Sequence, residues 1–379
     1  MISLPDNEPV LISTQEQFSD FIEKIQNEPV LAVDTESNSL FAYQEKVCLI
    51  QIATPAQDFI IDPLSVSDIS LLSTLFANPK QQKIFHAAEY DLICLKRDYG
   101  FKFANLFDTM IAARILGEPQ VGLGSLLDIY FGIKVDKRFQ RANWGARPLT
   151  RVMLDYARMD THYLFALKSI FEEKLKQRGL WELAKEDFDI LCQVEPPAIE
   201  SNGKSCWKIC GSTRINGRQA AILQSLCAYR DQQARKMDLP HFKVLSNAFL
   251  VDLCQNPPHT LDELGARRGA TERILKKHGT SLLKAIEQGE DSPPLNRQPN
   301  TRPNEKYMKR LEKLKEWRKL KAQDLKIESD VVIPKDIMEK IAAFNPKNKG
   351  DLQKIMWNTP WRFRHYGESI LNELSRLEE

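Results

Sequence analysis

The chain has 379 residues, enough for two or three domains, and its 42% hydrophobic and 27% charged content is ordinary for a globular protein. No apolar stretch approaches the roughly 20 residues that a transmembrane helix requires. The N-terminus MISLPDNEPV lacks the basic-then-apolar layout of a signal peptide. We therefore expect a cytoplasmic protein without a membrane segment, monomeric by default, whose seven cysteines are all reduced.

The two halves of the chain differ in charge. Residues 1–200 carry 20 Lys and Arg against 29 Asp and Glu, a net charge of −9, whereas residues 201–379 carry 33 against 22, a net charge of +11. This asymmetry favours a metal-binding catalytic part joined to a part that binds a polyanion. The alternative is a drift of charge along the chain without functional meaning.

The first half predicts an α/β domain. PVLAVDTE, KVCLIQIA and DFIIDP, within residues 29–63, are typical of three short strands. They follow one another too closely for helical crossovers, so they should pair as an antiparallel meander. Helices then alternate with strands, and a long helix is predicted from Thr150 to about Gly179. The sum is a mixed sheet flanked by helices.

The second half predicts two small all-α modules. A polar connector at 194–217 and a proline-bearing linker at 289–305 separate helical patterns. LQSLCAYRDQQARKMDLP aligns with LEKLKEWRKLKAQDLKIES, and HGTSLLKAI aligns with YGESILNEL, which indicates a diverged internal repeat. We therefore divide the chain into a domain at 1–193, the connector 194–217, a helical module at 218–288, the linker 289–305 and a second module at 306–379.

Asp34 and Glu36, in LAVDTES, stand two residues apart where an apolar strand ends. Their side chains should project from one face of that strand. A D-x-E pair is also common by chance, so the pair alone is weak evidence for a site. Asp91, in HAAEYDL, falls in the first turns of a helix, where an acid also complements the helix dipole. Glu89 is the competing residue for that structural role.

Tyr156 and Asp160, in DYARMD, are four residues apart on the predicted long helix, hence neighbours on one face. We expect an apolar stripe along the same side, made of Val152, Met159, Tyr163 and Leu167. The alternative to a functional site is a buried hydrogen bond between the two side chains. Asp155 should point about 100° away from Tyr156, toward solvent.

Each of these contexts tends to bury its acid. Buried carboxylates repel one another and are costly to desolvate unless a cation holds them together. Hard oxygen ligands select Mg²⁺ or Mn²⁺. The pattern therefore points to metal-dependent phosphoryl chemistry, with a tyrosine that orients water, since its reference pKa near 10 makes it a poor base.

The motifs VDTES, HAAEYDL and YARMD resemble those of the DEDD-type 3′→5′ exonuclease family, which has a ribonuclease H-like fold. The Y-x-x-x-D form of the third motif is similar to the tyrosine subclass (DEDDy). Both helical modules resemble the HRDC domain, on AYRDQQAR, FKVLSNAFL and KKHG in the first and EWRKLKAQ and RFRHYG in the second. This domain order resembles the bacterial ribonuclease D family.

The resemblance implies a site and a reaction. Asp34, Glu36 and Asp160 would bind one Mg²⁺ or Mn²⁺, and Asp34 and Asp91 would bind a second. Tyr156 would position the attacking water. The family releases nucleoside 5′-monophosphates from RNA 3′ ends, and tRNA precursors would be the substrate. The resemblance also marks Asp108 as a supporting or structural residue.

Further residues are candidates for contact with RNA. Leu40, Phe41 and Tyr43 follow the first motif and would stack on terminal bases, although core packing is an equal alternative. His86 would either contact a phosphate or cap the following helix. Of the two interpretations, we favour the helix cap. Arg141 is a candidate for substrate contact.

Two other functions compete with an exoribonuclease. A DNA exonuclease of proofreading type would use the same acids, because nothing in them separates ribose from deoxyribose. A non-catalytic RNA-binding protein would be expected to lack at least one acid, and all four are present.

Overall fold

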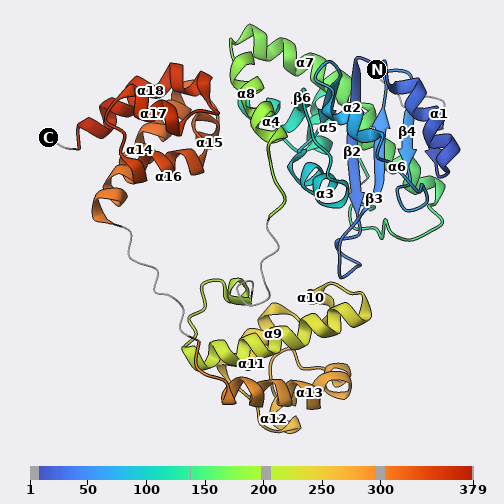
Figure 1. The fold of residues 1–379 in the computed structure, drawn as a ribbon, viewed down its shortest axis with the longest axis vertical. Helices are drawn as coiled ribbons and strands as arrows, with labels where there is room; N and C mark the ends of the chain where they lie inside the picture. Colours follow the sequence, from blue (N-terminus) through green and yellow to red (C-terminus); the bar gives the residue numbers. More distant parts are fainter. Residues whose placement is uncertain (1–7, 137, 198–205, 296–303, 378–379) are drawn as a thin grey trace. The chain divides into compact units, whose positions relative to one another are not determined.

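The computed structural model describes residues 8–136, 138–197, 206–295 and 304–377 (Figure 1). The chain forms two compact units, one comprising Met1–Ser37, Val47–Pro196 and Arg302–Glu379, and the other Asn38–Lys46 and Pro197–Thr301. Parts of the predicted connector and linker, at 198–205 and 296–303, lie outside the described residues.

A six-stranded mixed sheet forms the centre of the first unit, as the sequence predicts. Its strands lie in the order β1-β4-β3-β2-β5-β6. The predicted meander is confirmed, since β2 pairs antiparallel with β3, and β3 with β4. The other strands join in parallel. The bounds are β1 Val10–Ile12, β2 Val30–Ser37, β3 Val47–Ala53, β4 Asp58–Ile61, β5 Gln82–Phe85 and β6 Leu106–Asp108.

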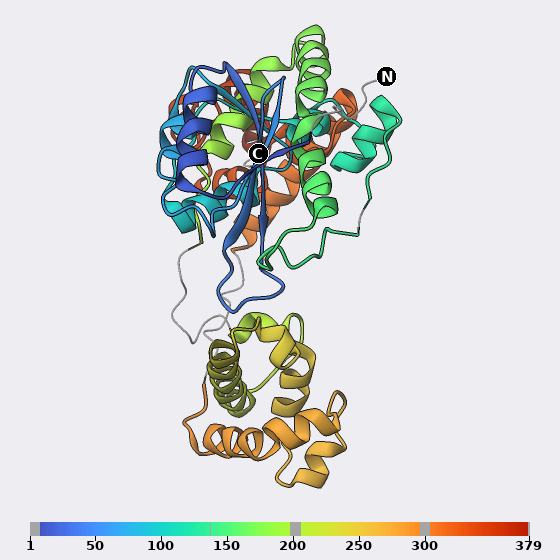
Figure 2. The same ribbon diagram turned by 90° about the vertical axis from the view of Figure 1, so that its right-hand side faces the viewer.

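Helices cover both faces of this sheet. Leu31 and Val33 of β2 pack in a core with α1 (Gln15–Ile25), α2 (Leu72–Ala77) and α3 (Glu89–Tyr99). Ala32 packs in a second core, on the opposite face, with the helices that follow β6. In Figure 2 the blue α1 lies on one side of the sheet and the green α6 and α7 on the other. The bounds on this side are α4 Thr109–Ile115, α5 Leu123–Phe131, α6 Arg151–His162, α7 Leu164–Gln177 and α8 Trp181–Cys192.

The predicted long helix is in fact two helices. Thr150 caps α6 as expected, its side chain accepting a hydrogen bond from the Met153 amide. The helix is interrupted at Tyr163, where α7 begins. The expected apolar stripe is confirmed at Tyr163 and Leu167, which are 2% and 0% exposed, and is wrong at Val152, which lies in the first turn of α6 and is 54% exposed.

The second half of the chain forms two helical modules, each with its own core. One, in the second unit, contains the 3₁₀ helix η1 and helices α9 to α13. The other, in the first unit, contains α14 to α18. The bounds are η1 Cys206–Cys210, α9 Gly217–Met237, α10 His241–Val244, α11 Asn247–Gln255, α12 Leu261–Gly265, α13 Glu272–Asp291, α14 Glu305–Leu325, α15 Ser329–Val332, α16 Lys335–Phe344, α17 Lys349–Ile355 and α18 Pro360–Ser375.

One cysteine prediction is wrong. Cys206 of η1 and Cys227 of α9 form a disulfide, whereas the other five cysteines are in no disulfide. The pairing arises because η1 packs against α9, a contact that a spacing of 21 residues does not reveal. No described helix has both the length and the apolar character needed to cross a bilayer.

The C-terminal module is joined to α8 by a buried ion-pair network within the first unit. Arg362 of α18, which is 1% exposed, lies 2.7 Å from Glu186 Oε1 and 2.6 Å from Asp187 Oδ1. Glu186 also accepts a hydrogen bond from the Trp361 amide. Removing one partner would leave an uncompensated buried charge, so the network fixes α18 against α8.

Candidate active site

Three of the predicted acids meet where β2 faces α6. Asp34 and Glu36 extend from β2, and Asp160 extends from α6. One carboxylate oxygen from each can be chosen so that all three lie within 4.8 Å of one another. In the described part of the chain, no other three His, Cys, Asp or Glu side chains come together in this way. The strand alternation that puts Asp34 and Glu36 on one face is therefore what makes the site.

Asp91 lies beside this group rather than within it. Its carboxylate accepts a 2.5 Å hydrogen bond from the hydroxyl of Thr35, the residue between Asp34 and Glu36. Asp91 is 7% exposed, and its charge helps to raise the pKa of Asp34. Glu89, the competitor for the helix-dipole role, is exposed at the start of α3. The structure thus places Asp91, and not Glu89, next to the other acids.

The electrostatics of the four acids are those of a site built for cations. Burial, before any other cause, raises the pKa of Glu36 to about 9 and those of Asp91 and Asp160 to about 7. Burial also raises the pKa of Asp34, with further increases from Asp91, Asp160 and Glu36. Without a cation, the acids must hold protons to coexist at neutral pH. A set of converging carboxylate oxygens therefore fits a divalent metal such as Mg²⁺ or Mn²⁺.

Tyr156 lines the same face of α6 as Asp160 and is 9% exposed. Its ring packs against Phe139 and Trp144, with centroid distances of 5.6 and 6.0 Å. Burial raises the pKa of Tyr156, and the nearby Asp160 and Glu36 raise it further. The phenol therefore stays protonated and can donate a hydrogen bond, which excludes it as a general base at neutral pH.

Asp108 shapes the turn that leads to Asp91. Its carboxylate accepts hydrogen bonds from the amides of Ala87 and Ala88, at 3.2 and 2.7 Å, and caps the N-terminus of α4. Ala87 has a φ of +60°, a conformation that costs energy for a residue with a Cβ and that these bonds help to hold. This geometry supports the structural role expected for Asp108.

The residues proposed to contact RNA are in varied surroundings. Leu40 is 36% exposed, and Lys243 Nζ lies 3.9 Å from the centroid of the Phe41 ring. Tyr43, in the same compact unit as 197–301, donates a 2.8 Å hydrogen bond from its hydroxyl to Asp231. Arg141 is exposed in the segment before α6. None of these positions tests contact with substrate.

The helix-cap interpretation of His86 is wrong. Ala88 occupies the N-cap of α3 and makes no side-chain cap hydrogen bond, and its amide donates to Asp108. His86 Nδ1 instead lies 2.9 Å from the Thr109 hydroxyl, and burial lowers the pKa of the imidazole. A phosphate contact through the other ring nitrogen stays a prediction.

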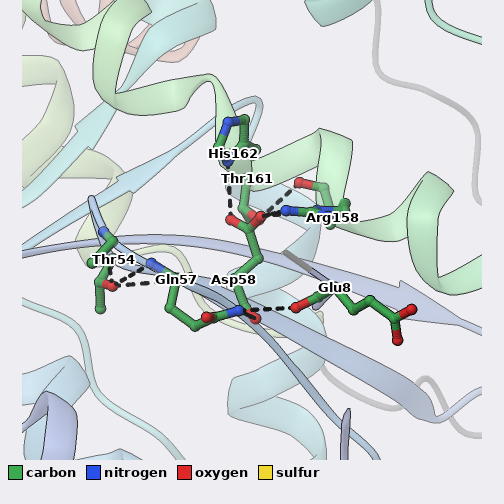
Figure 3. Close-up of polar contacts among 8 residues, drawn as sticks. Glu8, Thr54, Gln57, Asp58, Arg158, Thr161 and His162 are labelled. Atoms are coloured by element: carbon green, nitrogen blue, oxygen red, sulfur yellow. Dashed lines mark hydrogen bonds and ion pairs between the residues drawn. The ribbon is translucent and has the colours of Figure 1, made fainter. Parts of the chain in front are cut away.

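Sequence reasoning missed several residues that support the site. Thr35 lies inside the first motif, between Asp34 and Glu36. Its hydroxyl group, which can donate a hydrogen bond to a nearby acid, was the only feature of the sequence that could have indicated its role. Asp58 of β4 and Arg158 of α6 form a buried ion pair, and His162 of α6 lies beside them (Figure 3). Their separation of 100 residues leaves no local pattern, although an arginine among the buried residues of a helix is itself a sign of a buried partner.

Comparisons with known proteins agree with this geometry. A family model described as 3′-5′ exonuclease matches residues 9–176, and the HRDC domain model matches residues 219–286 and 308–374. The exosome complex component 10 homolog of Caenorhabditis elegans is 33% identical over 294 residues, which cover 76% of this chain and 33% of that protein. Ribonuclease D of Gluconacetobacter diazotrophicus is 29% identical over 282 residues, covering 74% of this chain and 71% of that protein.

The fold is shared with a solved structure along nearly the whole chain. The crystal structure of Escherichia coli RNase D matches with a TM-score of 0.71 at 24% identity, covering 98% of this chain and 99% of that one. Fold and acidic group together define a 3′–5′ exonuclease domain of a divalent-metal-dependent family. Followed by two HRDC domains, it makes the chain a homologue of ribonuclease D. The chain spans only about a third of its exosome-component relative from Caenorhabditis elegans (33%).

Proposed function

We propose that the protein is a 3′→5′ exoribonuclease that releases nucleoside 5′-monophosphates by hydrolysis. The observation that carries this proposal is the convergence of Asp34, Glu36 and Asp160 within 4.8 Å, with Tyr156 on the same helix as Asp160. The ribonuclease D homologues supply the preference for RNA. We further propose that it trims the 3′ ends of structured RNAs such as tRNA precursors, as a cytoplasmic monomer.

Two divalent ions, Mg²⁺ or Mn²⁺, complete the proposed site. Asp34, Glu36 and Asp160 would hold one ion, and Asp34 and Asp91 the other. When bound, such ions lower the pKa of water and stabilise charge on the leaving oxygen of a phosphodiester. The residues of the chain supply the rest. Tyr156, kept protonated, orients the attacking water, and the acids fix where the scissile phosphate can lie.

The domain boundaries at 1–193, 194–217, 218–288, 289–305 and 306–379 are part of this proposal. In it, the HRDC domains grip RNA through phosphate charge, which sets affinity and salt dependence rather than sequence choice. Leu40, Phe41, Tyr43, His86 and Arg141 are proposed to contact the 3′-terminal nucleotides. Such contacts would be made by stacking and by phosphate binding.

The experiment that tests this proposal compares RNA with DNA. The protein is incubated with Mg²⁺ or Mn²⁺ and with 5′-labelled duplexes that carry identical 3′ overhangs of RNA or DNA. Stepwise shortening of RNA, much faster than of DNA, is the expected result. Preferential shortening of DNA would favour a proofreading-type exonuclease, and binding without shortening would favour a non-catalytic RNA-binding protein.

A further inference from the structure

Helix α6 presents two functional faces, and only one carries the metal-binding acid. Tyr156 and Asp160, four residues apart, face the acids of β2. Arg158 and His162, also four residues apart, lie on the far side of the helix and meet Asp58 of β4 (Figure 3). Successive helical residues turn by about 100°, so Arg158 points away from both Tyr156 and Asp160. Any rotation of α6 that moved one pair would therefore move the other.

The contact with Asp58 is closely defined. Arg158 donates to Asp58 Oδ2 from Nε at 2.9 Å and from Nη2 at 2.5 Å. His162 Nδ1 lies 3.2 Å from the other oxygen, Oδ1. Asp58 is thus engaged through both of its oxygens by two successive turns of α6. Two contacts one turn apart constrain the rotation of a helix and its position along its axis.

Burial makes this contact costly to change. The side chains of Arg158 and Asp58 are 5% and 2% exposed. A buried ion pair often contributes little more stability than a well-packed apolar pair, because desolvation offsets the attraction. Its distinctive property is direction, since the planar guanidinium donates along fixed lines. Packing of α6 on the sheet therefore does not require these residues. A fixed rotation and position of α6 relative to the sheet does require them.

The sheet carries this register to the active site. Asp58 lies opposite Ala53 of β3, and Gln51 of β3 lies opposite Asp34 of β2. Asp58 and Asp34 are therefore both fixed to the same strand ladder, two residues apart along β3. Arg158 and Asp160 are likewise two residues apart on one helix. The ion pair therefore links the strand ladder that holds Asp34 to the helix that carries Asp160.

We propose that the pair Asp58–Arg158, with His162, is a positioning device that holds Asp160 and Tyr156 at the correct distance from Asp34 and Glu36. The proposal rests on the proposed function, because it concerns the same metal-binding acids. Their contacts with one another lie on the face of α6 opposite Tyr156 and Asp160. Their role is to fix the rotation of α6, so their loss should weaken metal binding and turnover more than it weakens the fold.

The decisive variant replaces the ion pair by an apolar pair, Asp58→Leu with Arg158→Met. This change avoids a lone buried charge, although leucine is larger than aspartate, so circular dichroism and thermal unfolding are used to check that the protein remains folded. Mn²⁺ binding is then measured by electron paramagnetic resonance of the free ion. We expect affinity to fall roughly tenfold or more, as for other residues that orient metal ligands. The kcat on a short single-stranded RNA should fall with it, while KM changes little.

Two further variants keep the test decisive. Arg158→Lys retains the positive charge but not the two-pronged geometry of the guanidinium. Its loss of Mn²⁺ affinity should therefore be smaller than that of the apolar double variant. It replaces the double variant in the test if that protein does not fold. Arg362→Lys makes the same change at a buried ion pair away from the acids, and its Mn²⁺ affinity should equal that of the wild type. A folded double variant, or failing that Arg158→Lys, with unchanged Mn²⁺ affinity and kcat would overturn the proposal.

The Mn²⁺ readout also separates this proposal from the proposed function. If the wild type binds Mn²⁺ but shortens no RNA, the proposed function fails, while the positioning role is still judged from metal affinity. If the wild type shortens RNA and the double variant matches it in both readouts, only the positioning role fails.

Discussion

Thr35 donates a 2.5 Å hydrogen bond to Asp91 from the strand position between Asp34 and Glu36. One strand segment therefore contributes to the site from both of its faces, with two acids on one side and a hydroxyl on the other. This bond lowers the pKa of Asp91, against burial, which raises it to about 7. Thr35 thus ties α3 to β2 and favours the charged form of the acid that α3 carries.

Thr35→Val should weaken metal binding at neutral pH. Valine has nearly the same shape as threonine but cannot donate, so the pKa of Asp91 should rise further and more of this acid should be protonated. We expect Mn²⁺ affinity at neutral pH to fall by roughly 10-fold, with much of the loss recovered at higher pH. Isothermal titration at two pH values measures both effects. Thr35→Ser, which keeps the hydroxyl, should behave like the wild type, and equal losses in the two variants would contradict this role.

Metal should stabilise the protein more at high pH than at low pH. Burial raises the pKa of Glu36 to about 9 and those of Asp91 and Asp160 to about 7, whereas in the unfolded chain such acids titrate near 4. The folded state therefore holds protons that the unfolded state has lost. The stability linked to these groups is complete below about pH 4 and is lost as pH rises through about 7 to 9. A bound cation replaces those protons.

Thermal unfolding with EDTA and with Mg²⁺, at about pH 5 and about pH 8.5, measures this difference. The Mg²⁺-induced rise in Tm should be larger at the higher pH. Because the Tm values with EDTA and with Mg²⁺ are compared at the same pH, the contributions of titrating groups away from the site cancel. Asp160→Asn removes one repelling charge. It should raise the Tm in EDTA at high pH and reduce the response to Mg²⁺. A Mg²⁺ effect that is equal at both pH values would contradict this account.

Tyr156→Phe should reduce turnover without weakening binding of RNA or metal. The variant keeps the ring that packs against Trp144 and Phe139 but loses the hydroxyl that would orient water. We expect kcat to fall about 10²-fold, as for the loss of one positioned donor. Single-turnover cleavage and filter binding separate the two effects. Tyr163→Phe, at the end of the same helix, is the matched control, and equal kcat values for the two variants would remove Tyr156 from the mechanism.

Arg362→Met should destabilise the first unit strongly. Glu186 and Asp187 would lose their buried cation, and breaking such a pair from one side costs about 3–5 kcal/mol. Urea unfolding measures the change in the free energy of unfolding. Lys349→Ala breaks an ion pair with Glu368 in which both side chains are exposed, and should cost about 0–1 kcal/mol. Similar losses in the two variants would mean that the network around Arg362 contributes no more than a surface pair.

Much of the fold could be predicted because its signals are local. The three strands of the meander have short apolar runs with too little chain between them for a crossover, and the structure confirms their pairing. The strands β1 and β6 were harder to predict, since each has only three residues and owes its existence to parallel pairing with a distant strand. The prediction from helical periodicity also failed at Tyr163, because the residues of α6 and α7 together follow one continuous helical pattern in the sequence.

The site divides in the same way. Asp34, Glu36, Tyr156 and Asp160 could be predicted because their relative directions follow from strand and helix periods. The supporting contacts could not, because they depend on tertiary packing. Asp58 meets Arg158 across 100 residues of chain.

The lysines of α14 illustrate how little a sequence reveals about the pairing of surface charges. Lys309, Lys313 and Lys315 pair with Glu305, Glu373 and Glu312 within their own module. A run of charges in the sequence does not reveal which of its members already have partners.

The central claim is that the acids around Asp160 cut RNA from its 3′ end. The most direct measurement is single-turnover shortening of a 5′-labelled RNA with Mg²⁺ by the wild type, Asp160→Asn and Asp155→Asn. Asp155 lies on the same helix and pairs with Arg151 at its surface, so its variant controls for loss of a nearby charge. We predict that the wild type and Asp155→Asn shorten the RNA stepwise and release nucleoside 5′-monophosphates, whereas Asp160→Asn does not. Shortening by Asp160→Asn at the wild-type rate would contradict the account.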